Sequence, residues 1–398
     1  MDSGHVSLNN FDETNNKRGN MKITIITMHN FPNYGSVLQA YATQEKLKGY
    51  TNAVEIIDYI SSGESVSRRI GSYILAGYKR NHLGHRPNPF AVTIKLPFRI
   101  LKKIRFGIFI KKYLKLSEKV YCTQEDLKTY PLHNGYYVTG SDQVWKLGYR
   151  DKIPFFLNFL PEQAQRIGYA VSFGNYKECK ESHNDFASVK DFIHRYSKIT
   201  VREDVGVDLL NKYCDYSGAI RIMDPTLVLS SDFWRGFATH AKINAGYILV
   251  YKVGNESDFE VFARNISTKT GLPLVRVCSN SILHIFKGKG RRIILPPVTE
   301  FVALIDNANY VLTDSFHGIA FSLNLGVEPI VFRKEYDGGR ITGLLKIFGE
   351  EERYCSDPNN VDILESKISW DKVNKILKDE RKKTDEFLKS VFGECKDE

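Results

Sequence analysis

Residues 22–59 decide the fold, and they read KITIITMHNFPNYGSVLQAYATQEKLKGYTNAVEIIDY. The first six residues form a short, β-rich apolar run, which suits a buried parallel strand. After a stretch of loop formers, residues 37–48 carry an apolar stripe, broken by Gln44, which predicts a helix ending at Gly49. A second strand is predicted at 54–59. This strand–loop–helix–strand order opens a doubly wound α/β domain.

The same alternation returns further along the chain. Three more strands are predicted, at 136–139, 166–171 and 198–201. Each is followed at once by a polar loop: Gly140-Ser141-Asp142, Ser172-Phe173-Gly174 and Arg202-Glu203-Asp204. Because open parallel sheets bind ligands at the carboxyl ends of their strands, these loops are candidate site loops.

A second α/β unit is predicted after Asp224-Pro225-Thr226. Its predicted elements alternate again: strands at 247–251, 274–278, 310–312 and 329–332, and helices at 259–270, 301–308 and up to about 325. The tail at 371–391 is charged and amphipathic, which predicts a terminal helix. We therefore predict an α/β protein with two Rossmann-like domains that face a central cleft, where active sites commonly lie.

The length of 398 residues also favours two domains, because one hydrophobic core rarely serves so long a chain. We expect four parts. They are a disordered leader at 1–20, an N-terminal α/β domain at 21–228, a C-terminal α/β domain at 229–340 and a C-terminal helical segment at 341–398.

Composition indicates a globular cytoplasmic protein. Apolar residues make up 42% and charged residues 26% of the chain. The six cysteines are far apart and include no Cys-x-x-Cys pair, which favours reduced thiols and argues against a zinc site. The sequence has no apolar run of about 18 residues, and its first 20 residues are too polar for a signal peptide. We expect no metal and no cofactor.

The positive charge is concentrated in one insertion at 61–120. The whole chain has a net charge of +10, whereas this segment holds 14 Lys and Arg residues against two acids. Within it, residues 100–116 resemble a basic amphipathic helix, which is typical of contact with an anionic membrane. A solvated helical face is the alternative. No nucleic-acid motif accompanies the charge, so we expect no nucleic-acid partner.

His317 lies in Thr313-Asp314-Ser315-Phe316-His317-Gly318, where a predicted strand leads into a helix. A histidine there is suited to proton transfer near neutral pH, and the neighbouring helix amides are suited to an anion. The alternative is a capping segment, in which Asp314 or Ser315 caps the helix and His317 only occupies its first turn.

Other candidates follow the first-domain strands. Arg202 is suited to a carboxylate or phosphate, or to an ion pair with Glu203 or Asp204. Asp142 is suited to accept a proton from a sugar hydroxyl, or to cap a helix. Further candidate binding residues are Asn33, Gly35, Ser36, Ser172, Ser315 and Arg340. For Ser36 the alternative is a helix N-cap, and for Arg340 it is a surface loop.

The order of these segments resembles the polysaccharide pyruvyl transferase family. The resemblance extends from about residue 22 to 349. It rests on Asn33-Tyr34-Gly35, Gly140-Ser141-Asp142-Gln143-Val144-Trp145, Ser172-Phe173-Gly174, Val201-Arg202-Glu203, Asp224-Pro225-Thr226, Thr313-Asp314-Ser315-Phe316-His317-Gly318 and Arg340-Ile341-Thr342-Gly343-Leu344-Leu345.

This resemblance implies a fold like that of the GT-B glycosyltransferases. It also implies transfer of a pyruvyl group from phosphoenolpyruvate to two hydroxyls of a sugar, which forms a ketal. His317 then matches the catalytic histidine, Arg202 an arginine that holds the donor, and Asp142 an acid that lines the site. The expected partners are phosphoenolpyruvate and a sugar acceptor that is free, nucleotide-linked or lipid-linked. The charge of the basic segment, and not the resemblance, favours a lipid-linked acceptor and peripheral contact with the inner membrane face.

Two other functions suit the same fold. One is a GT-B glycosyltransferase that uses a nucleotide sugar, and the other is a glycan- or anion-binding protein without catalysis. A sugar nucleotide that stabilises the protein would favour the first, and ligand binding without phosphate release would favour the second.

Overall fold

This computed structural model describes residues 21–60, 89–147, 150–176, 182–241, 243, 246–254, 256–279, 282–285, 288–333 and 339–395. The predicted leader at 1–20 and residues 61–88 of the basic insertion lie outside these ranges.

Seven parallel strands of the described residues form the first sheet, in the order β3-β2-β1-β4-β5-β6-β7. They are β1 (Lys22–Ile26), β2 (Ala53–Tyr59), β3 (Leu116–Tyr121), β4 (Gly135–Thr139), β5 (Gln165–Val171), β6 (Lys198–Val201) and β7 (Ile220–Arg221). The order reverses between β1 and β4, which is the doubly wound arrangement. The predicted strands of this domain are present, while β3 shows that residues 116–120 belong to the sheet and not to the insertion.

Six parallel strands of the described part of the chain form the second sheet, in the order β10-β9-β8-β11-β12-β13. They are β8 (Ile248–Tyr251), β9 (Leu274–Cys278), β10 (Arg291–Ile294), β11 (Tyr310–Thr313), β12 (Glu328–Phe332) and β13 (Tyr354–Cys355). This order also reverses, between β8 and β11. Because β13 pairs with β12, the prediction of a purely helical segment at 341–398 is incomplete.

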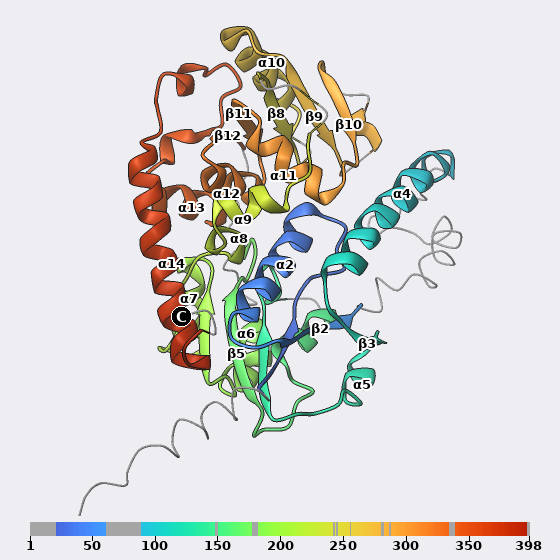
Figure 1. Ribbon diagram of the computed structural model, residues 1–398, viewed down its shortest axis with the longest axis vertical. Coiled ribbons are helices and arrows are strands. Elements are labelled where there is room, and N and C mark those ends of the chain that lie inside the picture. Colours follow the sequence, from blue (N-terminus) through green and yellow to red (C-terminus); the bar gives the residue numbers. More distant parts are fainter. Residues whose placement is uncertain are drawn as a thin grey trace, which may run out of the picture.

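Helices surround both sheets (Figure 1). They are α2 (Tyr34–Lys48), α4 (Pro89–Tyr113), α5 (Gln124–Leu127), α6 (Ser182–Ile193), α7 (Asp204–Cys214), α8 (Pro225–Val228), α9 (Ser231–Phe237), α10 (Phe259–Thr270), α11 (Val298–Asp306), α12 (Phe316–Leu325), α13 (Arg340–Phe348) and α14 (Trp370–Phe392). Short 3-10 helices are η1 (Arg150–Phe156), η2 (Ile282–Ile285), η3 (Glu351–Arg353) and η4 (Asp362–Leu364).

Helix α2 starts three residues earlier than predicted and lies between the two domains (Figure 1). Asn33 caps it, because its side-chain oxygen accepts a hydrogen bond from Gly35 N at 2.8 Å. Ser36 is therefore not the N-cap. The polar residue that interrupts the predicted stripe, Gln44, is buried and bonds Tyr113 O and Lys115 N at the end of α4.

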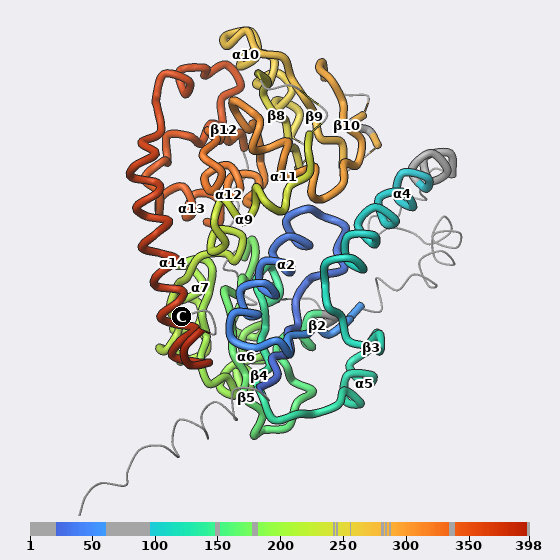
Figure 2. Tube along the Cα trace, viewed as in Figure 1, coloured from blue at the N-terminus to red at the C-terminus, as the bar shows by residue number. Residues whose placement is uncertain are grey.

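The two domains are packed together across α2. Tyr34 stacks on Phe301 of α11 with ring centroids 4.1 Å apart, and its hydroxyl donates to Pro296 O at 2.7 Å. Helix α14 then returns along both domains (Figure 2). Its last turns pack on the first domain, where Phe392 contacts Tyr50 and Tyr136.

The prediction of a two-domain α/β fold with a C-terminal helix is confirmed by these two doubly wound sheets. Among the described residues, no helix is both long enough and apolar enough to span a bilayer.

Candidate active site

The predicted site loops of the first domain follow adjacent strands. They come after β1, β4, β5 and β6, and the segment after β7 joins them. Because all these strands are parallel, their carboxyl ends meet at one edge of the sheet. The segment after β11, with His317, reaches the same place from the second domain, because the His317 ring lies near Asp224.

Asp224 is at the centre of this site and is buried. Its Oδ2 accepts hydrogen bonds from Ser141 Oγ and Arg202 Nη1, each at 2.9 Å. Its Oδ1 accepts from the backbone and hydroxyl of Thr226, at 3.0 and 2.7 Å. Burial acts to raise the pKa of Asp224, but His317 and Arg202 outweigh it and hold that pKa well below its ordinary value. The carboxylate is therefore ionised.

Arg202 is buried between two carboxylates. Besides its bond to Asp224, its Nε donates to Glu203 Oε1 at 2.9 Å, so the predicted alternative of an ion pair with Glu203 is present. Ser172 holds Glu203 from the other side, through a 2.9 Å hydrogen bond to the same oxygen. Burial acts to lower the pKa of Arg202, but the two carboxylates outweigh it and raise that pKa. The guanidinium stays charged.

Asp142 adjoins this cluster from the loop after β4. Its backbone has a φ of 78° and forms a β-bridge to Val171, so it does not cap a helix. Its Oδ2 accepts a 2.7 Å hydrogen bond from Ser36 at the start of α2. Burial acts to raise its pKa, but His317 and Arg202 lower it overall. Asp142 is therefore an ionised carboxylate.

His317 lies on the first turn of α12, with 8% of its surface exposed. Its Nε2 is 3.6 Å from Asp224 Oδ2, a distance that suits an ion pair but is longer than a hydrogen bond. On the other side the ring faces α2: a Cβ built on Gly35 would lie 2.1 Å from His317 Nδ1. Only glycine allows this approach between the domains.

The residues before His317 shape its loop. Ser315 is the N-cap of α12 and accepts from Gly318 N at 3.4 Å, so the capping alternative is correct for Ser315. Asp314 accepts from Val253 N and Gly254 N at 2.6 and 2.7 Å and so fixes the loop after β8. In this segment Ser315 therefore caps α12, while His317 lies close to the charged cluster.

Arg340 also lies near the cluster, as the first residue of α13. It lines a cavity of about 20 Å³ together with Arg202, Asp224, Arg221 and Phe316. Phe316 lies under the Arg202 guanidinium, 4.2 Å from it. The cavity has room for about one water molecule.

Two buried nitrogens of the cluster have no hydrogen-bond partner among the described residues: Arg202 Nη2 and His317 Nε2. Buried polar groups are nearly always paired in proteins, and unpaired ones mark places for a ligand, an ion or water. Both nitrogens adjoin the carboxylate of Asp224. They are two places in the cluster where a ligand, an ion or water could bind.

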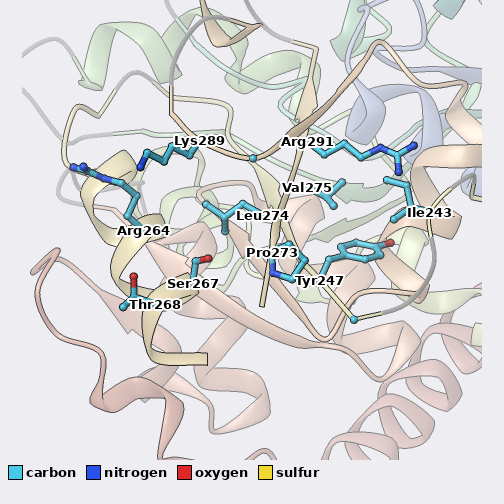
Figure 3. A pocket seen from close by; sticks show the side chains of 12 residues that line it. Ile243, Tyr247, Arg264, Ser267, Thr268, Pro273, Leu274, Val275, Lys289 and Arg291 are labelled. Atoms are coloured by element: carbon cyan, nitrogen blue, oxygen red, sulfur yellow. The ribbon is translucent and has the colours of Figure 1, made fainter. Parts of the chain in front are cut away.

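A larger hollow of about 570 Å³ lies at the other end of the second sheet, where β8, β9 and β10 begin. Figure 3 shows Pro273, Leu274 and Val275 in its middle, with Lys289 near Arg264 at one side. None of the predicted site residues lines it, and among its described lining residues there is neither a carboxylate nor a histidine. Its ionisable lining residues are Tyr247, Arg264, Lys289 and Arg291, none of which the sequence analysis singled out.

The sequence analysis gave Asp224 no place in the site, and it named Glu203 only as an ion-pair partner of Arg202. Both stand in segments that carry the family resemblance, Asp224 three residues after β7 and Glu203 two residues after β6, so their place in a motif was the available signal. Trp145, the last residue of the motif that starts at Gly140, is fully buried and stacks on Phe156 with ring centroids 5.0 Å apart. It belongs to the core.

A site between two doubly wound domains defines the class of the protein as an α/β fold of the GT-B kind. The family model described as polysaccharide pyruvyl transferase matches residues 33–334. That range includes His317, Arg202, Asp142 and Asp224, and it covers most of the chain. The protein therefore belongs to the polysaccharide pyruvyl transferase family. No curated protein sequence matches the chain.

Solved structures with a similar arrangement share little sequence with this chain. A putative UDP-N-acetylglucosamine 2-epimerase from Listeria monocytogenes is 10% identical, with 90% of each chain covered and a TM-score of 0.45. A UDP-GlcNAc 2-epimerase from Methanocaldococcus jannaschii is 14% identical over 91% of this chain and 94% of that chain, with a TM-score of 0.44. A glycosyltransferase from Rickettsia africae is 12% identical over 92% and 93%, with a TM-score of 0.45.

Proposed function

We propose that the protein transfers a pyruvyl group from phosphoenolpyruvate to two hydroxyls of a sugar in a polysaccharide or its precursor. The observation that carries this proposal is a pair of buried nitrogens in the Asp224 cluster, Arg202 Nη2 and His317 Nε2. Neither has a hydrogen-bond partner among the described residues. One nitrogen belongs to a permanent cation and the other to a group that carries or releases a proton. Anion binding and proton transfer are the two tasks that this reaction needs.

Arg202 and Arg340 would bind the carboxylate and phosphate of the donor. Arg202 is held in place by Glu203 and Asp224, so its remaining nitrogen is preorganised for an anion. Arg340 lines the same small cavity from the second domain. Because that cavity is too small for the donor, binding begins with separation of the domains around the contact of Gly35 with His317.

The chemical steps balance with the groups present. The His317 imidazolium donates its proton to the methylene carbon of phosphoenolpyruvate, and the neighbouring carbon becomes electrophilic. A first sugar hydroxyl adds to that carbon, and Asp142 accepts its proton. A second hydroxyl then displaces phosphate, which leaves with the second hydroxyl proton, and the ketal is closed. Asp224 stabilises the imidazolium and orients its ring.

The test follows phosphate release and the mass of the glycan product, with phosphoenolpyruvate and a panel of glycan acceptors. We expect His317→Ala to lower the rate at least about 100-fold, the usual contribution of a general acid. His240→Ala, at an exposed histidine, is the matched control and should keep the wild-type rate. A wild-type rate in His317→Ala would remove the proposed role of His317.

Binding is measured separately, so that an unsuitable acceptor does not decide the outcome. Phosphoenolpyruvate should raise the melting temperature of the wild type and of His240→Ala, and have little effect on Arg202→Gln. If a sugar nucleotide stabilises the protein and phosphoenolpyruvate does not, the protein is a glycosyltransferase instead.

A further inference from the structure

Helix α4 is unusual in its charge. Between Pro89 and Tyr113 the sequence contains no acidic residue, while its basic residues are Lys95, Arg99, Lys102, Lys103, Arg105, Lys111 and Lys112. Figure 1 shows that the helix extends outward from the side of the first domain. So much charge of one sign on a projecting element suits a partner of opposite charge.

One side of α4 holds it to the protein. Phe98, Phe106, Phe109 and Ile110 are buried on this side. Phe106 contacts the Tyr34 ring with centroids 5.0 Å apart, which joins α4 to the first turn of α2. The inner side thus has a complete apolar contact and needs no further partner.

The opposite side of α4 is apolar and exposed. Ile100, Leu101, Ile104 and Ile108 are 49%, 43%, 54% and 57% exposed, and at 100° per residue they fall on one face of the helix. The described residues contain ten exposed large apolar side chains, and these four share a single helix. We call these four residues the outer stripe. Such a concentration marks an interaction surface, whereas scattered exposed side chains do not.

Basic residues border the outer stripe on both flanks. By helical spacing, Lys103 lies along one flank and Arg105 and Lys112 along the other, while Lys111 extends the stripe itself. An apolar stripe between rows of cations is the pattern of helices that lie in the interface of an anionic bilayer. There the aliphatic side chains enter the acyl boundary and the cations reach the lipid phosphates.

We propose that α4 docks the protein onto the surface of an anionic lipid bilayer through its outer stripe. A second copy of the chain is the poorer occupant, because two helices with seven cations and no acid would repel each other. An anionic bilayer offers an apolar interior to the outer stripe and negatively charged headgroups to the basic residues beside it.

Docking would bring the site close to the bilayer. The contact chain is short: Phe106 of α4 touches Tyr34, and the next residue, Gly35, touches His317. A glycan carried on a lipid is therefore the acceptor form that this placement suits. The docking itself goes beyond the proposed function and is measured without any catalysis.

The experiment is flotation of the full chain with lipid vesicles. One set is phosphatidylcholine alone, and the other contains about 30% phosphatidylglycerol, which gives an anionic surface. We expect the wild type to float only with the anionic vesicles at low salt and to be released at about 0.5 M salt.

Two variants separate the two parts of the surface. Ile104→Ser with Ile108→Ser removes the outer stripe, and Lys103→Gln with Lys111→Gln and Lys112→Gln removes charge. Each should weaken vesicle binding at least about tenfold. The matched controls are Leu132→Ser, at another exposed apolar residue, and the triple change of Lys375, Lys378 and Lys382 to Gln on α14. Both controls should bind as the wild type does.

Three results would overturn the proposal. They are no flotation with anionic vesicles, equal loss in the α14 control, and a dimer in solution that Ile104→Ser with Ile108→Ser converts to monomers. The last result would assign the outer stripe to a second copy of the chain. Melting temperatures of the variants show that each remains folded.

Discussion

Gly35 and His317, which belong to different domains, lie so close that a Cβ built on Gly35 would meet the imidazole ring. The missing side chain at Gly35 lets the imidazole sit directly against α2, where Nδ1 faces the backbone and Nε2 faces Asp224. Glycine weakens a helix by about 1 kcal/mol relative to alanine, so a glycine inside α2 has a cost in stability. In return for this cost in stability, the imidazole of His317 can lie directly against α2.

We predict that Gly35→Ala lowers both stability and activity. The new methyl group would meet the ring, so the domains must part or His317 must turn, at a cost of about 1–3 kcal/mol. Pyruvyl transfer should then fall at least about tenfold because the imidazole leaves its place. Thermal melting and phosphate release measure the two effects.

Gly236→Ala is the matched control for this change. Gly236 also lies in a helix, α9, and a Cβ there would meet nothing within 4 Å. Alanine should raise stability by up to about 1 kcal/mol through helix propensity and leave activity unchanged. If Gly35→Ala behaved like Gly236→Ala, the contact with His317 would not be tight in solution.

Among the elements, helix α14 is hydrogen-bonded to the segment that connects the two domains. Arg381 Nε donates to Leu227 O at 3.0 Å, and its Nη2 donates to Asn324 Oδ1 at 2.8 Å. Asn324 of α12 in turn donates to Thr226 O and Leu229 O, at 2.8 and 2.9 Å. The segment that holds Asp224 in place is thereby tied to both α12 and α14.

We predict that Arg381→Ala lowers the free energy of unfolding by about 3 kcal/mol. The change leaves Leu227 O and Asn324 Oδ1 without this donor, and an unsatisfied buried group costs about 1–3 kcal/mol. Urea unfolding measures the loss. Lys378→Ala, at an exposed position of the same helix, should change stability by less than about 0.5 kcal/mol. Equal losses of unfolding free energy in both variants would show that α14 stabilises the protein only as a helix and not through the hydrogen bonds of Arg381.

At the scale of the whole molecule, buried tyrosines join the sheets and the domains. Tyr34 and Tyr251 lie at the domain interface with ring centroids 6.1 Å apart, and Tyr169 is buried in β5. Burial raises the pKa of each of the three above the ordinary value. The folded state therefore retains protons that the unfolded chain releases near pH 10.

This difference predicts a loss of stability in alkali. A tyrosine pKa that is raised in the folded state stabilises that state below the unfolded pKa of about 10. This contribution is lost as the pH rises from there through the raised pKa of the folded state. The free energy of unfolding should fall by about 1.4 kcal/mol per pH unit for each such tyrosine. Urea unfolding between about pH 9 and pH 11 measures the slope. Tyr34→Phe should reduce the slope by one proton, and an unchanged slope would contradict its burial in the folded state.

Much of the architecture is predictable because parallel strands and their helices leave strong periodic patterns. Most predicted elements agree with the structure to within a few residues. The edge strand β3 was not predicted, because its exposed residues Glu118 and Lys119 resemble the basic insertion around it. The two-residue strands β7 and β13 were missed as well, because strands so short have no period to detect.

The strand-end loops that form the candidate site were predictable, but the contacts between their side chains were not. The motifs singled out His317, Arg202 and Asp142, yet nothing in the spacing indicates that Asp224 lies against two of them. Ion pairing depends on distances between residues that are far apart in the chain, such as the 3.6 Å between His317 and Asp224. Periodicity and propensity report only on neighbours along the sequence.

The sequence by itself determined the two doubly wound units, the order of the polar loops and the charge of α4. These are local properties, set by residue type and spacing. Tertiary structure alone decided that Gly35 meets His317, that Asp224 joins Arg202 to the imidazole, and that the outer stripe of α4 faces away from the protein. The reason is physical: which side chains share a buried site, and which face of a helix stays exposed, depends on how distant surfaces pack.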